Sequence, residues 1–381
     1  MRYLLALLAV GLFAQEPGPP PAQARHPVLA IGSAAPDFSL PGVDGKTYSL
    51  KDFAGSPILM VMFICNHCPT SQLYEGRMQK LVEDYRGKGV ATVAIQPNDP
   101  SAILLSELGY TDVSDSLEEM KIRAEYRHFA FPYLYDGETQ SVAQAYGPVA
   151  TPHVFIFDKE RKLRYEGRID DAQRESIVKK QDARAALDAM LAGKPVPVPH
   201  TPAFGCSTKW KSKIDSQLRE MKRIEAEPVN VEMVTADGLR KLRMNDSNKV
   251  LLVNFWATWC GPCLTEFPEI EKTWRMFRRR DFDLVTVAAN LPDERAGVMR
   301  ILQQEHASSR NLMFGTEDTY GLQAAFEPKW EGGVPFTMVI APGGKVIFQQ
   351  QGEVDVIALR RIILAQLENE TYVGHPDYWK H

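Results

Sequence analysis

The chain has 381 residues, of which 44% are hydrophobic and 24% charged, and its formal net charge is −4. This length exceeds that of one ordinary compact domain, so we expect two globular domains. The composition is typical of globular proteins and contains no basic stripe, which excludes nucleic acid as an expected partner.

The first residues predict an export signal. Met1–Tyr3 precedes an apolar run, Leu4–Phe13, that is too short to cross a bilayer and resembles a signal-peptide core. Ala22–Ala24 offers a small-x-small cleavage site, with Ala14 as an earlier alternative. A buried N-terminal helix is the other interpretation, but the prolines from Pro17 onward cannot continue it. We expect a signal peptide over residues 1–24 in a periplasmic or secreted protein, which an uncleaved signal would tether to the membrane.

The first predicted domain, residues 30–193, alternates strands with helices. A β-hairpin is expected within residues 26–55. The run Ile58–Ile64 is rich in β-branched and other apolar residues and predicts a buried strand. The remaining expected elements are helices at about 68–87, 116–128 and 182–192 and strands at 90–95, 154–157 and 163–167.

A proline-rich stretch, Lys194–Pro202, separates the halves of the chain. Alternating prolines favour extended polyproline and disfavour helix or central strand, which indicates a domain boundary. The charged stretch Lys209–Glu227 has helical spacing and predicts a solvated connecting helix, with partner docking as the weaker alternative. We therefore expect a linker with its helix over residues 194–227.

In the second predicted domain, residues 228–370, the order of elements repeats. The expected strands are 249–256, 284–288 and the hairpin 336–340/345–348, and the expected helices lie at about 263–277, 293–305, 320–326 and 356–369. Strands that alternate with helices and end in a hairpin predict an α/β fold, a three-layer sandwich with a mixed sheet in each half. Residues 371–381 are expected to form a tail.

Five cysteines carry the chemistry that the sequence predicts. Four form two Cys-x-x-Cys motifs, Cys65/Cys68 and Cys260/Cys263, each between an apolar strand and a helix; Cys206 is left over. A thiol at a helix N-terminus is favoured as the thiolate by the helix dipole. A thiolate with a second thiol one turn away can attack a disulfide and then be released by its neighbour.

The second half resembles the thioredoxin superfamily. Phe255–Cys263, which reads Phe-Trp-Ala-Thr-Trp-Cys-Gly-Pro-Cys, is similar to the active-site strand and turn of the exported TlpA/ResA-like thiol–disulfide oxidoreductases. Gly333–Thr337 stands where these proteins place a cis-proline, Pro335. The resemblance covers roughly residues 228–370 and implies two tandem thioredoxin-like sandwiches.

This resemblance implies a role for each residue of the second site. Cys260 would attack, Cys263 would resolve, and Pro335 would shape the groove for the partner chain. Glu266 would tune the cysteine pKa values, and its alternative is a first-turn acid favoured by the helix dipole. Thioredoxin has a buried Asp where this chain has Asn254, which places more weight on Glu266.

The first half resembles the redoxin (AhpC/TSA-like) proteins less closely. The resemblance rests on Cys65–Pro69, on the expected cis-proline Pro152 within Ala150–His153, and on Gly205–Trp210 around Cys206. Cys68-Pro69-Thr70 resembles the peroxidatic turn of peroxiredoxins. However, those enzymes have Thr or Ser at the position of Cys65, and they place an Arg near the position where this chain has Thr151-Pro152. A dithiol centre is therefore favoured over a peroxidase.

Other interpretations of the first site stay open. His67 with the cysteines would suit a copper(I) or zinc site. Alternatively, Cys65 and Cys68 would be two buried structural thiols. Cys206 would be a resolving thiol, a disulfide partner for Cys65 or an inert buried cysteine. His67 is expected to be exposed and to lower a thiolate pKa, or to be a plain turn residue. His153 is expected at the surface, with contact to the Cys65 groove as its alternative. Trp256 is expected in the core, and Trp259 is expected to cap the active-site surface.

We therefore expect an exported thiol–disulfide oxidoreductase that needs no cofactor. Its expected partners are disulfide-containing protein substrates and an upstream electron-donor protein. Two dithiols on one chain suggest a relay between them, because a tether raises the effective concentration. The alternatives are a copper-handling or metalloprotein-assembly factor, and a thiol peroxidase with antioxidant activity in the first domain.

Overall fold

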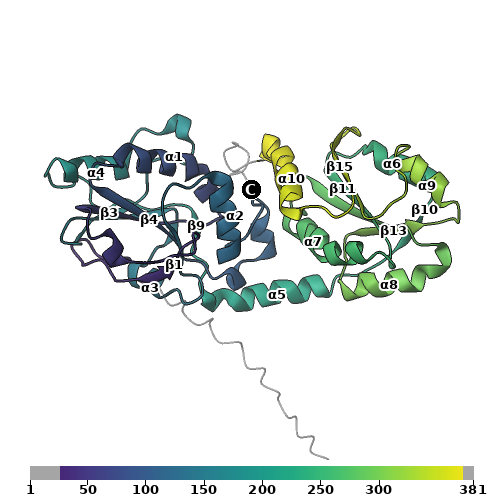
Figure 1. The fold of residues 1–381 in the computed structure, drawn as a ribbon, viewed down its shortest axis with the longest axis horizontal. Coiled ribbons are helices and arrows are strands. Elements are labelled where there is room, and N and C mark those ends of the chain that lie inside the picture. The colour runs from purple at the N-terminus through teal and green to yellow at the C-terminus, as the bar shows by residue number, and fades with distance from the viewer. Residues whose placement is uncertain (1–25, 372–381) are drawn as a thin grey trace, which may run out of the picture.

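The computed structural model describes residues 26–371, and the predicted signal segment lies outside this range, as does the predicted tail beyond Thr371. Two α/β domains lie side by side, and helix α5 runs along one edge of the pair (Figure 1). Within the described range, no helix is both long and apolar enough to cross a membrane.

The first domain is built on a five-stranded sheet of order β5-β4-β3-β7-β8. Strands β3, β4 and β5 run parallel, whereas β7 is antiparallel to β3 and β8 is antiparallel to β7. The strands are β1 Ser39–Pro41, β2 Thr47–Ser49, β3 Ile58–Phe63, β4 Val90–Gln96, β5 Tyr133–Tyr135, β6 Ala150–Thr151, β7 His153–Phe157, β8 Leu163–Gly167 and β9 Cys206–Ser207. The helices are α1 Pro69–Tyr85, α2 Leu117–Arg127, α3 Ser141–Tyr146 and α4 Asp182–Leu191.

Alternating side chains of β3 divide this domain into three layers. Met60 and Met62 pack with α1, α2 and α4, whereas Val61 and Phe63 pack on the other face with α3 and the β1–β2 hairpin. Every residue of β3 is buried, because both faces of the strand are covered. The predicted strand is confirmed, and it ends directly before the first pair of cysteines.

The second domain repeats this arrangement with one more edge strand, in the order β10-β13-β12-β11-β14-β15. Its strands are β10 Glu232–Val234, β11 Val250–Trp256, β12 Phe282–Ala288, β13 Arg310–Phe314, β14 Phe336–Ile340 and β15 Val346–Gln351. Its helices are α6 Ala236–Met244, α7 Gly261–Phe277, α8 Arg295–Gln304, α9 Thr319–Phe326 and α10 Val356–Thr371. One face of the sheet packs on α6 and α9 and the other on α7, α8 and α10. The predicted pair of three-layer sandwiches with mixed sheets is therefore confirmed.

The segment between the domains differs from its prediction. Helix α5, Ile214–Glu225, begins five residues later than expected, since Lys209 donates its backbone N–H to the Asn98 side chain at 2.8 Å and Trp210 packs on the first core. The proline-rich stretch is extended, as predicted, and it folds back onto the first domain. His200 forms a bridge to Glu166, and β9 pairs with β6.

The two domains also contact each other directly. Ile103 and Leu108 of the first domain belong to the same buried cluster as α7 and α10 of the second. Asp112 accepts an ion-paired hydrogen bond from Arg361 at 2.6 Å, and Arg280 donates to the Gly109 carbonyl at 3.1 Å. The chain therefore holds its two cysteine centres on one packed body.

Candidate active site: two cysteine centres

The second centre lies at the N-terminus of α7. Cys260 is the N-cap residue of this helix, and its sulfur accepts the backbone N–H of Cys263 at 3.2 Å. The two cysteines are joined by a disulfide. A sulfur in this position faces the positive end of the helix dipole, which stabilises the thiolate that forms when the disulfide is reduced.

The surroundings of this disulfide are open to solvent. Trp259 is 65% exposed, and Gly261 and Pro262 are exposed as well. Pro335 follows a cis peptide bond, as expected, and the Val334 carbonyl before it lies 3.6 Å from the Cys260 sulfur. Trp256 is fully buried and packs on Phe267, also as expected. The structure therefore brings Cys260, Cys263 and the cis-proline together, with Cys260 6% and Cys263 1% exposed beneath these open neighbours.

Glu266 lies one helical turn after Cys263, on the side of α7 that faces the sheet. Its carboxylate accepts the Asn254 amide at 3.0 Å and the Val354 backbone N–H at 3.1 Å. Burial raises the pKa of Glu266, and the two hydrogen bonds oppose this only in part. A buried carboxyl with a raised pKa near a dithiol is able to take up and return a proton, whereas the Asn254 amide is not.

The first centre is arranged differently, because its second cysteine is the one that caps the helix. Cys68 is the N-cap residue of α1, and its sulfur accepts the Ser71 backbone N–H at 3.4 Å. Cys65 lies before the helix, with its sulfur 3.1 Å from the Thr151 hydroxyl. The expected cis-proline is Pro152, which follows Thr151 through a cis bond.

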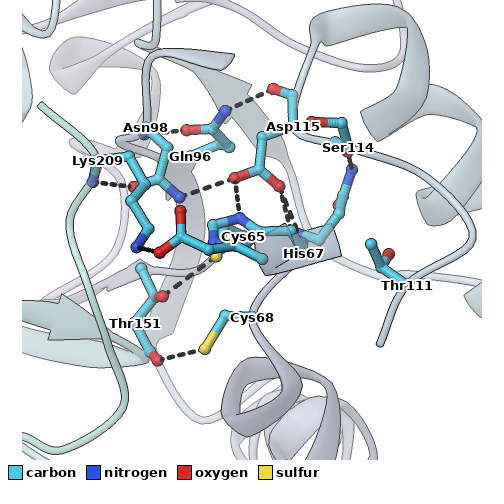
Figure 2. Close-up of polar contacts among 12 residues, drawn as sticks. Cys65, His67, Cys68, Gln96, Asn98, Thr111, Ser114, Asp115, Thr151 and Lys209 are labelled. Carbon is cyan, nitrogen blue, oxygen red and sulfur yellow. Dashed lines mark hydrogen bonds and ion pairs between the residues drawn. The ribbon is translucent and has the colours of Figure 1, made fainter. Parts of the chain in front are cut away.

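The prediction that the middle pair of the first motif is exposed was wrong. Asn66 and His67 are both buried. The Asp115 carboxylate, which is itself fully buried, accepts both of their backbone N–H groups at 2.9 and 3.0 Å. It also accepts the His67 ring Nδ1–H at 2.6 Å and the Asn98 amide at 2.8 Å (Figure 2). Asp115 follows the motif by almost fifty residues, so no local pattern could have revealed it.

Two further residues escaped the sequence-based prediction. Thr151 contacts both thiols of the motif, since its hydroxyl meets Cys65 and its carbonyl lies 3.3 Å from the Cys68 sulfur. Lys209 donates its backbone N–H to Asn98, the residue that also holds Asp115 (Figure 2). The cis-proline motif is a usable signal for Thr151, whereas Lys209 joins the site only through the folded-back segment.

Cys206 reaches this centre from strand β9. In the antiparallel β6–β9 pair, Cys206 lies opposite Thr151, the residue whose carbonyl is 3.3 Å from the Cys68 sulfur. The proline-rich segment and β9 fold back over the domain and carry Cys206 to this place. Three thiols and Thr151 thus meet at one point in the first domain.

The electrostatics of the three thiols select Cys68 as the thiolate. Burial raises the pKa of Cys65 well above its usual value. Burial acts in the same direction on Cys68, but the neighbouring Cys206 and Cys65 thiols and the charge of His67 bring the pKa of Cys68 well below its usual value. When Cys68 ionises, its thiol no longer has a proton to donate to the Thr151 carbonyl. The groups that stabilise the Cys68 thiolate outweigh this lost hydrogen bond.

His153 is not the surface residue that we expected. It is buried, its Nε2 lies 2.9 Å from a Glu166 carboxylate oxygen, and its Nδ1 accepts the Val149 N–H at 3.4 Å. Glu166 stands on the neighbouring strand β8 and also contacts His200 of the folded-back segment. His153 therefore helps to hold that segment.

A metal site fits this centre poorly. Cys65, His67 and Asp115 each offer one ligand atom, and these atoms lie within 4.8 Å of one another. However, the Asp115 carboxylate already accepts four hydrogen bonds, one of them from the His67 ring. A metal ion would have to displace bonds that satisfy a buried charge, which is costly.

Two family models match the chain, one to each part. A model described as the AhpC/TSA family matches residues 31–166, and a model described as Redoxin matches residues 192–361. The chain therefore belongs to the thioredoxin superfamily. It is a redoxin- and ResA-like protein of that superfamily, and its class is that of an oxidoreductase.

Two curated relatives and one solved structure are each similar to a part of the chain. The chain is 28% identical over 138 residues to "Thiol-disulfide oxidoreductase ResA" of Geobacillus thermodenitrificans. This match covers 36% of this chain and 68% of the relative. It is 32% identical over 117 residues to "Peroxiredoxin Q, chloroplastic" of Gentiana triflora, and this match covers 29% of this chain and 53% of the relative. A crystal structure of a hypothetical protein from Sinorhizobium meliloti 1021 is 40% identical with a TM-score of 0.43, covering 49% of this chain and 97% of that one.

Proposed function

We propose that this chain is an exported thiol–disulfide oxidoreductase that exchanges disulfides with protein substrates through Cys260 and Cys263. The observation that carries the proposal is the setting of this disulfide: Cys260 is 6% exposed and Cys263 1%, and the residues beside Cys260 are open to solvent. Cys260 caps α7 beside cis-Pro335, with an exposed tryptophan next to it. A substrate segment would approach Cys260 across these exposed residues and along the edge at Val334, with which no strand among the described residues pairs.

The reaction follows from the order of the two thiols. In the reduced form, the Cys260 thiolate attacks one sulfur of the substrate disulfide, and the other substrate sulfur leaves as a thiolate. The Cys263 thiolate then attacks the Cys260 sulfur and releases the second substrate thiol. Two electrons pass to the substrate, and the Cys260–Cys263 disulfide that the structure contains is formed.

Glu266 is proposed as the proton acceptor for Cys263. Its buried carboxyl lies three residues after Cys263 on α7, which places both on one side of the helix. When ionised, it accepts the Cys263 proton before the resolving attack. Asn254 fixes one carboxylate oxygen, and the Val354 N–H fixes the other.

The first domain is proposed as a second redox centre, with Cys65, Cys68 and Cys206 as its thiols. It would exchange electrons with the Cys260/Cys263 pair of the same chain, and an upstream electron-donor protein would act on the Cys260/Cys263 pair. The packed contact between the domains supports such a relay, because attachment to one body replaces a bimolecular encounter.

Export is proposed from the apolar segment Leu4–Phe13, which lies outside the described residues. A periplasmic or secreted location suits an enzyme of disulfides, since protein disulfides persist in oxidising compartments. Fusion of residues 1–30 to a reporter that is active only after export would test this part of the proposal.

A thiol peroxidase in the first domain is the second candidate. The similarity to a peroxiredoxin Q and the position of Cys68 at the start of α1 favour it. Hydrogen peroxide turnover by the full chain with both Cys260→Ser and Cys263→Ser would support this candidate. Turnover no faster than that of a variant that also carries Cys68→Ser would remove it.

A redox titration tests the main proposal. The protein is equilibrated with dithiothreitol buffers, alkylated, and each cysteine peptide is read by mass spectrometry. A reductase is expected to show a Cys260/Cys263 potential of roughly −270 mV, as in thioredoxin, and a disulfide-forming oxidant one of roughly −120 mV. A pair that stays oxidised throughout would contradict the proposal.

A further inference from the structure

Strand β9 occupies a particular place in the first domain. It pairs antiparallel with Ala150–Thr151, the two residues directly before cis-Pro152, and sets Cys206 opposite Thr151. In the second domain, Val334 precedes cis-Pro335 in the same way, but no strand among residues 26–371 pairs with it. The strand edge before the cis-proline is therefore free in the second domain, whereas β9 of the same chain fills it in the first domain.

The filling segment also presents a thiol to the reactive sulfur. Thr151 contacts all three cysteines of this centre. Its hydroxyl contacts Cys65, its carbonyl contacts Cys68, and its backbone pairs with Cys206. Cys206 lies opposite Thr151, whose carbonyl oxygen is 3.3 Å from the Cys68 sulfur. A partner strand that bears a cysteine would approach the centre along the same edge.

The segment is fixed at several points, so its position is not accidental. Gly205 has a φ of +148°, and a Cβ there would come within 2.0 Å of the Thr151 carbonyl oxygen. The Thr208 hydroxyl donates to the Pro148 carbonyl at 2.7 Å. Upstream, Glu166 and Pro199–Thr201 exchange backbone hydrogen bonds, and Glu166 holds His200.

The cover has a consequence for access. Cys68 is fully buried, and Cys260 is itself only 6% exposed. The difference lies in the cover: β9 fills the edge beside Cys68, whereas no strand of the described residues covers the edge beside Cys260. A separate folded protein cannot reach Cys68 while β9 is in place. A small thiol or disulfide needs much less room.

We propose that β9 is a built-in substrate strand: Cys206 is the thiol that exchanges with Cys68, and the first centre therefore reacts with low-molecular-weight disulfides rather than with folded proteins. This inference rests on the proposed redox role of the first domain and assigns its resolving thiol and its substrate class. Cys65 is then a neighbouring thiol, with its sulfur 3.1 Å from the Thr151 hydroxyl, and it does not resolve.

The exchange balances without a further reactant. The Cys68 thiolate attacks one sulfur of a disulfide RSSR, so that a Cys68–S–S–R bond forms and RS⁻ leaves with the electron pair. The Cys206 thiol loses its proton to the released RS⁻ and attacks the Cys68 sulfur. The Cys68–Cys206 bond forms and the second RS⁻ leaves, taking a proton from solvent; the dithiol has lost two electrons and RSSR has gained them.

The first experiment maps the disulfide. The full chain with Cys260→Ser and Cys263→Ser retains only three thiols, and it is reduced, treated with glutathione disulfide, acid-quenched, alkylated and digested. We expect a Cys68–Cys206 linked peptide with Cys65 alkylated. A Cys65–Cys68 linked peptide with Cys206 alkylated would overturn the inference and leave the proposed redox role standing. Three alkylated thiols in a folded protein would overturn both.

The second experiment does not depend on the equilibrium product. In the same background, Cys206→Ser and Cys65→Ser are compared as matched removals of one thiol each. After glutathione disulfide is added, intact-mass spectrometry is expected to show that the Cys68–glutathione adduct accumulates in Cys206→Ser. In Cys65→Ser, the adduct is expected to be transient, because Cys206 resolves it. The reverse pattern would assign resolution to Cys65 and contradict the inference.

Discussion

Cys68 and Cys260 hold the same position in their two domains, although one closes its Cys-x-x-Cys motif and the other opens it. Each is the N-cap residue of the helix after the central strand, and each sulfur accepts the N–H of the residue three positions later. That later residue is Cys263 in the second domain and Ser71 in the first. The residue three positions later therefore supplies a second thiol in the second domain only; the thiols near Cys68 are Cys65 and Cys206, and we assign resolution to Cys206.

The fit of β9 predicts the effect of one added methyl group. Gly205→Ala places a Cβ against the Thr151 carbonyl and should lift β9 from β6. With the Cys260 and Cys263 thiols removed, we expect the Cys68–glutathione adduct to persist although Cys206 is still present, and Cys68 to be alkylated faster in the reduced protein.

Gly55→Ala is the matched control for this substitution. It makes the same chemical change at a glycine with open space around it and no left-handed φ. Both adduct lifetime and alkylation rate should equal those of the parent. Equal rates for Gly205→Ala and the parent would show that β9 does not control access to Cys68.

Glu266→Gln tests the proton acceptor of the second site. The raised pKa of Glu266 means that resolution by Cys263 should accelerate as pH rises through that pKa and the carboxylate forms. The Gln variant should lose this rise. Asn254 is able to turn its amide to accept from the new Gln, so the fold should tolerate the change. Stopped-flow measurement of thiol release against pH gives the profile.

Glu269→Gln is the control on the same helix with the same change of charge. Glu269 contacts Arg360 and Lys272 rather than Asn254, and it should keep the parental pH profile. A rise of equal size in Glu266→Gln and the parent would assign Glu266 a structural role only.

The sequence could predict those parts of the fold that local patterns encode. The apolar runs before Cys65 and Cys260 are buried strands because both faces of each sheet are covered, and alternation with helices follows from the spacing. The burial of His67 could not be predicted, since it depends on Asp115 far along the chain. The helix register that makes Cys68 the cap, and the return of Cys206 to it, likewise depend on tertiary contacts.

Glu271 should make stability depend on pH. This carboxyl is buried on α7 beside the Ser309 hydroxyl, and burial raises its pKa to about 7. In the unfolded chain its pKa is about 4.3, so between these values the folded state keeps a proton that the unfolded state has released. The stabilising effect is therefore complete below about pH 4.3 and is lost as pH rises towards 7, at up to about 1.4 kcal/mol per pH unit.

Urea unfolding at pH 5, 6 and 7 checks this sign. The parent should lose more stability with rising pH than Glu271→Gln, which does not titrate. Parallel curves for the two proteins would mean that Glu271 is already ionised in the folded state at pH 5.

A mixed-disulfide trap tests the central claim that Cys260 attacks protein disulfides. The reduced full chain with Cys263→Ser is mixed with a disulfide-containing protein such as insulin, quenched with acid and analysed by non-reducing electrophoresis and peptide mass spectrometry. We predict a covalent complex linked through Cys260, absent from a matched Cys260→Ser variant. A complex linked through Cys65, Cys68 or Cys206, or the absence of any complex, would contradict the account.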